Sequence, residues 1–541
     1  MPTLEIDGKQ VAYEGKKMIL QVANDHGIEL PQYCYHPGLS IVASCRICLV
    51  EVESPDPKDP TKLVKLPKLT PSCQTPAVDG MKVYSKSPKS KANQQAVMEF
   101  LLINHPLDCP VCDQAGECYL QDYSYKYGRA ESRFEEDKAK NPKKDVGDHI
   151  LLYADRCIMC TRCVRFTREI SGTAELAVFG RGHKEEIDIF PGRPVNNPLA
   201  SNVVDLCPVG ALLDKDFLFT QRVWFLKSTP SISPISSAGE NIEIHHNEGR
   251  IYRIKPRFNK DVNQWWIADE TRYGYTFVHE NRLSTPERMD NAAPMETTWD
   301  RATAQVGESL RSAYANGAGG NLAAIFSPFD STEEMFLQAK YVRSLDPQAF
   351  LALNPSRIAG EDQVFKNPAT GAVTYVIKGE KAPNRVGAEK ILAAFGGNVC
   401  GLGDLAGKKI AGVIVSLDPI EHNDAQLAEA VAGIKTVVTL ATRPSRLRER
   451  SEVLLPATTW AEKSGVYENF AGKIQLFEQS IPPLDDTRSA GRIFWDLLGT
   501  PGMYHAPTVR DAMTDAGLQG YADLEVPPTQ LRIDDMEFAE L

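Results

Sequence analysis

The sequence predicts a multidomain α+β protein in which several small cysteine-rich domains precede one larger α/β domain. Three observations predict this fold class. The chain has 541 residues, enough for several domains of ordinary size. Eleven of its twelve cysteines lie in the first 207 residues, in runs spaced C-x10-C-x2-C, C-x2-C-x5-C and C-x2-C-x2-C. Later, buried strand patterns alternate with a helical pattern, at Asn321–Phe326, Glu333–Leu345 and Ile410–Leu417.

Composition and charge argue against several classes of protein. The 60 Lys and Arg against 71 Asp and Glu give a formal charge of −11, which disfavours a nucleic-acid partner. The start of the chain, MPTLEIDGKQ, has no basic region followed by an apolar run, so no secretory signal is expected. Apolar stretches are far shorter than the ~20 residues of a membrane helix. We therefore expect no direct membrane span and a reducing compartment, where close cysteine pairs favour metal over disulfides.

Residues 1–86 are expected to form a small β-grasp ferredoxin domain. Thr3–Ile6 and Lys9–Tyr13 are strand-like runs around Asp7-Gly8, a hairpin signal, and Met18–Ala23 follows as a helix. Plant-type ferredoxins hold a [2Fe–2S] cluster with C-x4-C-x2-C and a remote cysteine. Here the first gap is ten residues, so structural zinc stays an alternative. The predicted ligands are Cys34, Cys45, Cys48 and Cys73.

Residues 87–130 are expected to hold a second metal site. Asn93–Asn104 shows helical spacing, and we expect its side that carries Val97, Phe100, Leu101 and Asn104 to face a core. The helix should end near His105, because Pro106 disfavours a helical residue before it. The cysteine run that follows offers three ligands and lacks a fourth, which His105 can supply. The predicted ligands are His105, Cys109, Cys112 and Cys118.

Residues 131–221 are expected to form a ferredoxin-like domain with one [4Fe–4S] cluster. The stretch Glu131–Asp145 is charged and is typical of a solvated linker. Bacterial ferredoxins use C-x2-C-x2-C-x3-C-P, with the last cysteine serving the other cluster. Counting back from Cys207-Pro208 by this template gives Asn197, Ala200 and Val203, none of which can replace cysteine. The predicted ligands are therefore Cys157, Cys160, Cys163 and the remote Cys207.

Four arginines surround this third run: Arg156, Arg162, Arg165 and Arg168. Two interpretations stay open. Positive charge near the cluster would favour its reduced form and raise its potential. Alternatively, the arginines lie on a solvated helix face.

The first 220 residues resemble the large iron–sulfur subunit of respiratory complex I, which in bacteria is the G subunit of NADH–quinone oxidoreductase. The segments that carry the resemblance are Pro31–Cys34, Cys45–Cys48, the His105 set with Tyr119-Leu120-Gln121, and Arg156–Cys163. One departure is Ala43, where the family usually has glycine. The same core is shared by the diaphorase subunit of NAD-reducing hydrogenases and by iron-only hydrogenases.

The resemblance implies one [2Fe–2S] cluster on the Cys34 set and two [4Fe–4S] clusters, on the His105 set and the Cys157 set. It implies an electron-transfer subunit that passes electrons from the flavin/NADH-binding subunit toward the quinone-side iron–sulfur subunits. No substrate site is expected on this chain. The implied location is peripheral, on the cytoplasmic side of the inner (plasma) membrane, within a membrane-bound complex.

The rest of the chain resembles molybdopterin oxidoreductases. Residues 222–285 look like a remnant cluster-binding region, in which the four ligand positions are Ser233, Ser236, Glu240 and Ala268. Residues 286–541 look like a degenerate molybdopterin-oxidoreductase-like α/β domain, with Ala461–Gly465 in the segment that handles the pterin. No cysteine lies between Cys207 and Cys400 to bind molybdenum. We therefore expect no fourth cluster and no molybdopterin.

Three other functions are alternatives. A molybdenum or tungsten formate dehydrogenase, or an NAD-linked relative, would need the missing pterin-domain cysteine. An iron-only hydrogenase would need further cysteines in residues 208–399, which contain none. A zinc-stapled scaffold would use the same cysteines without redox chemistry.

Overall fold

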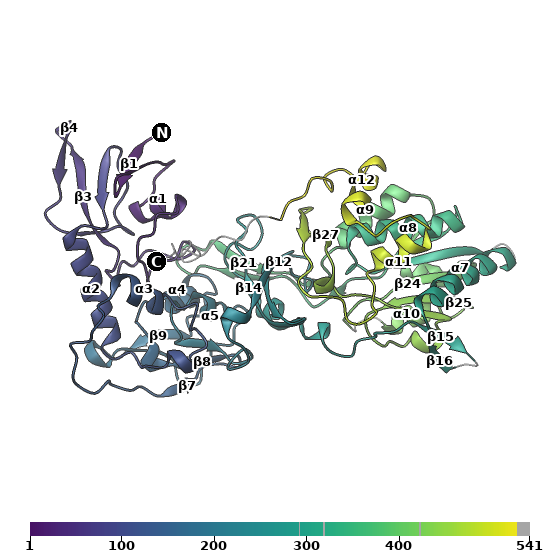
Figure 1. Ribbon diagram of the computed structural model, residues 1–541. Coiled ribbons are helices and arrows are strands. Elements are labelled where there is room, and N and C mark those ends of the chain that lie inside the picture. Colours follow the sequence, from purple (N-terminus) through teal and green to yellow (C-terminus); the bar gives the residue numbers. More distant parts are fainter. Residues whose placement is uncertain (291–292, 318–319, 421–423, 527–541) are drawn as a thin grey trace. The chain divides into compact units, whose positions relative to one another are not determined.

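The computed structural model describes residues 1–290, 293–317, 320–420 and 424–526. Within them the chain forms two compact units (Figure 1). The first unit contains Met1–Leu226 and also Phe365–Tyr375; the second contains Lys227–Val364 and the described residues from Val376 to Val526. No helix in the described part of the chain is long and apolar enough to cross a membrane.

The first unit begins with a β-grasp sheet. Its strands follow the order β2-β1-β6-β3-β4, with β5 beside β3, and β1 lies parallel to β6. The left-handed Asp7 (φ 48°) and Gly8 (φ 87°) form the predicted hairpin turn. Helix α1 covers a core that includes Leu20, Val50 and Val52. The bounds are β1 Thr3–Ile6, β2 Lys9–Ala12, α1 Ile19–Asp25, β3 Leu49–Asp56, β4 Asp59–Lys65, β5 Thr70–Pro71 and β6 Met81–Tyr84.

Two helices follow, α2 (Pro88–Leu102) and α3 (Tyr119–Tyr127). The predicted helix before His105 is confirmed, but it starts earlier because the Ser87 hydroxyl caps it by accepting a hydrogen bond from the Ser90 amide. The predicted buried face is wrong in part: Phe100 is 74% exposed. Asn104 is exposed as well, whereas Val97 and Leu101 pack against a core as predicted. The fully buried residues of the helix are Ser90, Gln94 and Met98.

The remainder of the first unit holds two small antiparallel sheets and two short helices. One sheet has the order β11-β8-β7 and the other pairs β9 with β10. The predicted linker at 131–145 is largely irregular and exposed, apart from its last three residues in β7. The bounds are β7 Lys143–Asp145, β8 Ile150–Tyr153, α4 Arg162–Glu169, β9 Leu176–Phe179, β10 Glu186–Ile189, α5 Asn202–Leu206 and β11 Leu212–Asp214.

The second unit is built on an eight-stranded sheet with the order β16-β15-β26-β25-β24-β17-β18-β23. The strands from β26 to β23 are parallel, and β15 and β16 form an antiparallel edge. The predicted strands correspond to β17 and β24. The bounds are β15 Glu287–Asp290, β16 Ala293–Glu296, β17 Asn321–Phe326, β18 Phe350–Leu353, β23 Val399–Gly401, β24 Ile410–Ser416, β25 Thr436–Ala441 and β26 Val453–Pro456.

Helices cover both faces of this sheet, as a parallel sheet requires. Along β17, Leu322, Ala324 and Phe326 pack toward one helix layer, whereas Ala323 and Ile325 face the other layer. The first layer contains α7, α8, α9, α11 and α12, and the second contains α10. The bounds are α7 Trp299–Asn316, α8 Thr332–Leu345, α9 Arg385–Phe395, α10 Asp424–Ala430, α11 Ala490–Leu497 and α12 Ala506–Asp515.

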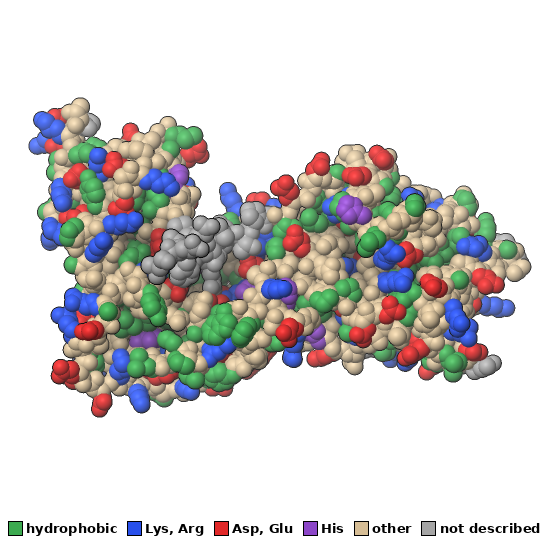
Figure 2. Space-filling model, viewed as in Figure 1, with side chains coloured by type: hydrophobic (Ala, Val, Ile, Leu, Met, Phe, Trp, Pro, Cys, Tyr) green, Lys and Arg blue, Asp and Glu red, His purple; other side chains and the backbone are tan. Residues whose placement is uncertain are grey.

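The smaller elements of the second unit include a three-stranded antiparallel sheet, β12-β13-β14, followed by α6. Two further strand pairs are β19 with β22 and β27 with β28; β20 and β21 also pair, and they overlap the segment Phe365–Tyr375 that the first unit contains. The bounds are β12 Lys227–Ile232, β13 Asn241–Asn247, β14 Arg250–Pro256, α6 Asp269–Tyr273, β19 Arg357–Ile358, β20 Gln363–Lys366, β21 Val373–Ile377, β22 Glu380–Lys381, β27 Gly465–Glu468 and β28 Ile474–Phe477. On the face drawn in Figure 2, acidic and basic side chains are interspersed.

Candidate metal centres

The first predicted ligand set lies on the loop between α1 and β3 and on the segment after β5. Cys34, Cys48 and Cys73 are buried, and Cys45 is partly buried. The loop is shaped by two left-handed residues, Ala43 (φ 49°) and Arg46 (φ 60°). The left-handed backbone at Ala43 gives a physical reason for the glycine that is usual there, because glycine adopts this conformation without a Cβ clash.

The four thiols of this set interact in pairs. The Sγ atoms of Cys48 and Cys73 are 3.5 Å apart. This contact lowers the pKa of Cys48 to about 7 and raises the pKa of Cys73. Cys45 likewise lowers the pKa of Cys34 to about 5. Thiolates, the form that binds metal, are thus favoured on one cysteine of each pair.

The second predicted set lines a pocket, with Asp108, Ala115, Gln121, Arg156 and Gly210 as its other lining residues. Its four members are His105, Cys109, Cys112 and Cys118. Cys118 is the N-cap residue of α3, and Cys112 follows the short helix η1 (Cys109–Val111). The ends of these two helices therefore fix the backbone of both cysteines. Gly210 is close enough that a Cβ there would overlap the Sγ of Cys112. The missing side chain at Gly210 therefore leaves space for the Cys112 side chain, and a larger residue at position 210 would fill that space.

The environment keeps His105 neutral. Burial, followed by the charges of Arg156 and Lys138, lowers its pKa to about 4. A neutral imidazole has a free ring nitrogen that can bind metal. Burial also raises the pKa of Cys118 to about 12, so this thiol needs a bound cation to become a thiolate.

The third predicted set, Cys157, Cys160, Cys163 and Cys207, lines a pocket of its own. The other lining residues are mostly apolar: Leu152, Ile158, Thr161, Arg162, Ile187, Val209, Ala211 and Leu212. Left-handed Met159 (φ 53°) and Thr161 (φ 59°) curl the ligand loop before α4, and Cys207 ends α5. Burial raises the pKa of Cys157 to about 12 and of Cys160 to about 11.

The arginines around this run divide into two groups. Arg168 is exposed on α4, as the solvated-face interpretation predicts. That interpretation is wrong for Arg156, Arg162 and Arg165, which are 2%, 6% and 8% exposed because their guanidinium groups hydrogen-bond inside the unit. Arg156 forms an ion pair of 2.7 Å with Asp108 and lies over the ring of Tyr153.

The four positions that resemble a lost cluster site are buried, and hydrogen bonds connect three of them. The hydroxyls of Ser233 and Thr271 are 3.0 Å apart, and Thr271 also donates to the carboxylate of Glu240. Glu240 accepts a further hydrogen bond of 3.0 Å from the amide of Ala268. The donor set here is hydroxyl and carboxylate oxygen in place of thiolate sulfur, which does not suit an iron–sulfur cluster.

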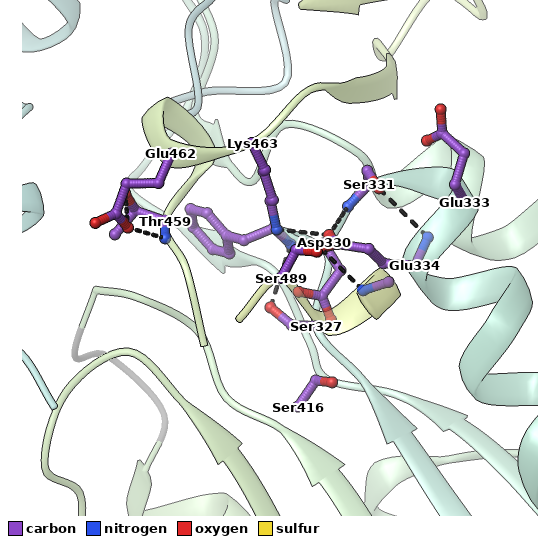
Figure 3. Close-up of polar contacts among 12 residues, drawn as sticks. Ser327, Asp330, Ser331, Glu333, Glu334, Ser416, Thr459, Glu462, Lys463 and Ser489 are labelled. Atoms are coloured by element: carbon purple, nitrogen blue, oxygen red, sulfur yellow. Dashed lines mark hydrogen bonds and ion pairs between the residues drawn. The ribbon is translucent and has the colours of Figure 1, made fainter. Parts of the chain in front are cut away.

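A further cavity lies in the second unit beside the carboxyl ends of β24 and β25. Its lining includes Asp330, Ser416, Thr442, Thr459 and Lys463. Figure 3 shows the charged residues next to it. Lys463 forms a buried ion pair of 2.5 Å with Glu334, and burial raises the pKa of Asp330 to about 7. The sequence pattern points to the segment with Lys463 but does not predict this cluster.

The ion pairs around that cavity are internal to the domain. Glu334 also caps α8 through the Ser331 amide, and Glu333 pairs with Arg510 at 2.9 Å. Thr459 and Glu462 form another capping box (Figure 3). These side chains connect α8, α12 and the 459–463 segment. Within the described ranges, no three His, Cys, Asp or Glu side chains are close enough to hold a single metal ion.

Five family models match this chain. They are described as a 2Fe-2S iron-sulfur cluster binding domain (residues 1–88), NADH-ubiquinone oxidoreductase-G iron-sulfur binding region (94–133), NADH-quinone oxidoreductase subunit 3, ferredoxin-like domain (147–213), NADH-ubiquinone oxidoreductase NDSU1/NuoG-like, 4Fe-4S domain (226–276) and Molybdopterin oxidoreductase (382–499). The predicted fold class is thereby confirmed, including iron–sulfur domains of both cluster types.

Curated relatives agree with these matches. The NADH-ubiquinone oxidoreductase 75 kDa subunit of Reclinomonas americana is 43% identical over 302 residues, 56% of this chain and 42% of the relative. The G subunit of NADH-quinone oxidoreductase from Rickettsia felis is 36% identical over 345 residues, 64% of this chain and 49% of the relative. The matched part thus spans less than half the length of these relatives.

Among solved structures, a chain from an NAD+-reducing [NiFe]-hydrogenase is 28% identical and covers 41% of this chain and 91% of its own, with a TM-score of 0.36. At that score the likeness carries no argument about fold or function.

Proposed function

Because this chain is a homologue of the G subunit of NADH-quinone oxidoreductase, we propose that it is an electron-transfer subunit of the peripheral arm of such an enzyme. Electrons would pass from a flavin/NADH-binding subunit through three clusters on this chain toward quinone-side iron–sulfur subunits. The chain itself would have no substrate site. The complex would lie on the cytoplasmic side of the inner (plasma) membrane, with this chain peripheral to the membrane.

The observation that carries the proposal is the grouping of twelve side chains into three sets of four. Each of the two sets proposed for [4Fe–4S] clusters lines its own cavity, and no ligand of one set lines the cavity of the other. In the set proposed for the [2Fe–2S] cluster, Cys48 and Cys73 are in contact and Cys34 and Cys45 form a second interacting pair. The proposed assignments are Cys34, Cys45, Cys48 and Cys73 for [2Fe–2S], His105, Cys109, Cys112 and Cys118 for the first [4Fe–4S], and Cys157, Cys160, Cys163 and Cys207 for the second.

When bound, iron–sulfur clusters supply reversible one-electron transfer. The contribution of this chain is to hold the ligands and to control their surroundings. The mostly apolar lining of the Cys157 cavity would limit the access of water to a bound cluster. His105 presents a neutral nitrogen in place of a thiolate, which lowers the negative charge of its ligand set.

We propose that the chain holds no fourth cluster and no molybdopterin. The hydroxyl and carboxylate side chains at Ser233 and Glu240 support the first part, because they hydrogen-bond with Thr271 at the position of the lost site. The buried ion pair between Lys463 and Glu334 supports a scaffold role for the second unit, because it satisfies these charges within the protein. The family match over 226–276 then reflects a retained fold without the cluster ligands.

The test is reconstitution of the full chain with iron and sulfide under anaerobic conditions. We expect about ten iron atoms per chain, the content of one [2Fe–2S] and two [4Fe–4S] clusters, and a visible absorption that bleaches with dithionite. Cys207→Ser should remove the signal of one centre, whereas Cys400→Ser, which lies outside the three sets, should not. A colourless protein with bound zinc would refute the proposal, and about four extra irons would refute the absence of a fourth cluster.

Partners are tested separately by co-purification from the native membrane. We expect a flavin- and NADH-binding protein to co-purify with the chain. Molybdenum in the purified complex would instead favour the formate dehydrogenase alternative.

A further inference from the structure

Two buried arginines on α4 connect the first and third predicted ligand sets. The guanidinium of Arg165 donates to the carbonyl of Cys34 at 2.5 Å and to the carbonyl of Cys160 at 3.3 Å. These are ligands of two different sets. Arg165 also donates to the carbonyl of Ser40, on the Cys34 loop, at 2.5 Å.

Arg162 makes the same kind of connection one turn earlier. It donates to the carbonyl of Tyr35, which follows Cys34, at 2.6 Å, and to the carbonyl of Leu206, which precedes Cys207, at 3.3 Å. Each arginine therefore binds one backbone segment from each of the two ligand sets.

In the described part of the chain, neither arginine is in direct ion-pair contact with a carboxylate, although the charge of Glu169 acts on Arg165 from a distance. Among the described residues, the Nε of each guanidinium has no hydrogen-bond partner although it is buried. Glu169, one turn after Arg165, instead accepts hydrogen bonds from the amide and hydroxyl of Ser40. A buried cation without a counter-charge is costly, so a negative group is expected beside it.

Both candidate centres would supply that negative group. In a cluster held by four cysteines, the thiolates outweigh the positive charge of the iron–sulfide core, and reduction adds further negative charge. Arg162 lines the cavity of the Cys157 set, and the carbonyl contacts of Arg165 place its charge between Cys34 and Cys160. The same positive charge therefore acts on both sites.

We propose that Arg162 and Arg165 are shared positioning residues that couple these two centres. They fix the Cys34 loop against the Cys157 loop and act as a common counter-charge, so that the two reduction potentials rise together. This inference rests on the proposed iron–sulfur function, and it assigns the coupling to two side chains that are not ligands themselves.

The test replaces Arg165 with glutamine in the full, reconstituted chain and measures the midpoint potential of each centre by redox titration followed by electron paramagnetic resonance. The potentials of both the Cys34 and the Cys157 centres should fall, each by about tenfold in the reduction equilibrium, or about 59 mV for a one-electron couple. Arg162→Gln should lower the same two potentials. The matched control is Arg168→Gln, the same change on the exposed face of α4, which should move neither.

A fall at one centre only, no fall at either, or an equal fall with Arg168→Gln would overturn the inference. If Arg165→Gln fails to assemble, Arg165→Lys is measured instead. An ammonium group cannot bind both carbonyls as a guanidinium does. The difference between the potentials of the Cys34 and Cys157 centres should therefore change. An unchanged difference would overturn the inference. An unchanged chain that binds no iron would overturn the proposed function itself, whereas loaded centres with independent potentials would overturn only the coupling.

Discussion

At the residue scale, Gly210 is the glycine, among those described, where an added Cβ would come nearest to a predicted cluster ligand. A Cβ at this position would overlap the Sγ of Cys112 and lie 3.1 Å from the Cβ of Gln114. Both neighbours are buried, so they have little room to move. Glycine is therefore required here by space, since its φ is not in the left-handed region.

We predict that Gly210→Ala displaces Cys112 and removes the cluster proposed for the His105 set. Iron should fall by about four atoms per chain, the content of one [4Fe–4S] cluster. The resonance signals of the other two centres should persist. Gly433→Ala is the matched control, because no atom lies within 4 Å of a Cβ there. Full iron content in Gly210→Ala would contradict the prediction.

His105 permits a second prediction at this scale. Since its pKa is lowered to about 4, the imidazole is neutral at pH 7, and a thiolate in its place would add a negative charge. His105→Cys should therefore lower the reduction potential of this centre by tens of millivolts, while the other two centres serve as internal controls in the same titration. A measured rise would refute the charge argument.

At the element scale, the sequence predicts elements with local signals well. The hairpin at Asp7-Gly8 and the strand β17 carry such signals, a turn dipeptide and a continuous apolar run. The buried face of α2 is different, because Phe100 has the right spacing but faces outward. Which side of a helix is covered depends on neighbours distant in the chain, and spacing alone does not contain that information.

The same limit applies to the candidate sites. The cysteine spacings predict three ligand sets because each set contains at least one C-x2-C pair. The bridges of Arg165 to Cys34 and of Lys463 to Glu334 join residues more than a hundred positions apart, so no local pattern predicts them. Because such distant contacts leave no local pattern, the sequence alone left two interpretations open for the four arginines.

The ion pair that connects α8 to the 459–463 segment yields an element-scale prediction. Lys463→Met would leave the buried carboxylate of Glu334 without its cation, which should cost about 3–5 kcal/mol of domain stability at pH 8. Burial raises the pKa of the neighbouring Asp330 to about 7, and a carboxyl with a raised pKa costs less stability as the pH falls. The loss should therefore be smaller at pH 5.

The measurement is denaturant unfolding of the second unit at both pH values. Lys473→Met is the control, because its ion pair with Asp261 is largely exposed and should contribute less than ~1 kcal/mol. Equal losses in the two variants would show that the buried pair is not special.

At the scale of the whole molecule, the two units differ in what stabilises them. The second unit has an eight-stranded sheet with an extensive core on both faces. The first unit divides its apolar residues among small sheets and short helices, and its cysteine sites lie among them. Small domains with limited cores depend on metals or other cross-links for stability.

We therefore predict that removing iron from the reconstituted chain unfolds much of the first unit and leaves the second folded. Without iron, buried thiols such as Cys118 and Cys157, whose pKa values are raised to about 12, would be protonated and neutral. The ligand loops would then no longer be cross-linked by the clusters. Limited proteolysis followed by mass spectrometry should give early cleavage within residues 1–226 only after chelation. The second unit, Lys227–Val364 and Val376–Val526, should resist cleavage equally with and without iron. Equal protection of the first unit in both states would show that its small cores suffice without the clusters.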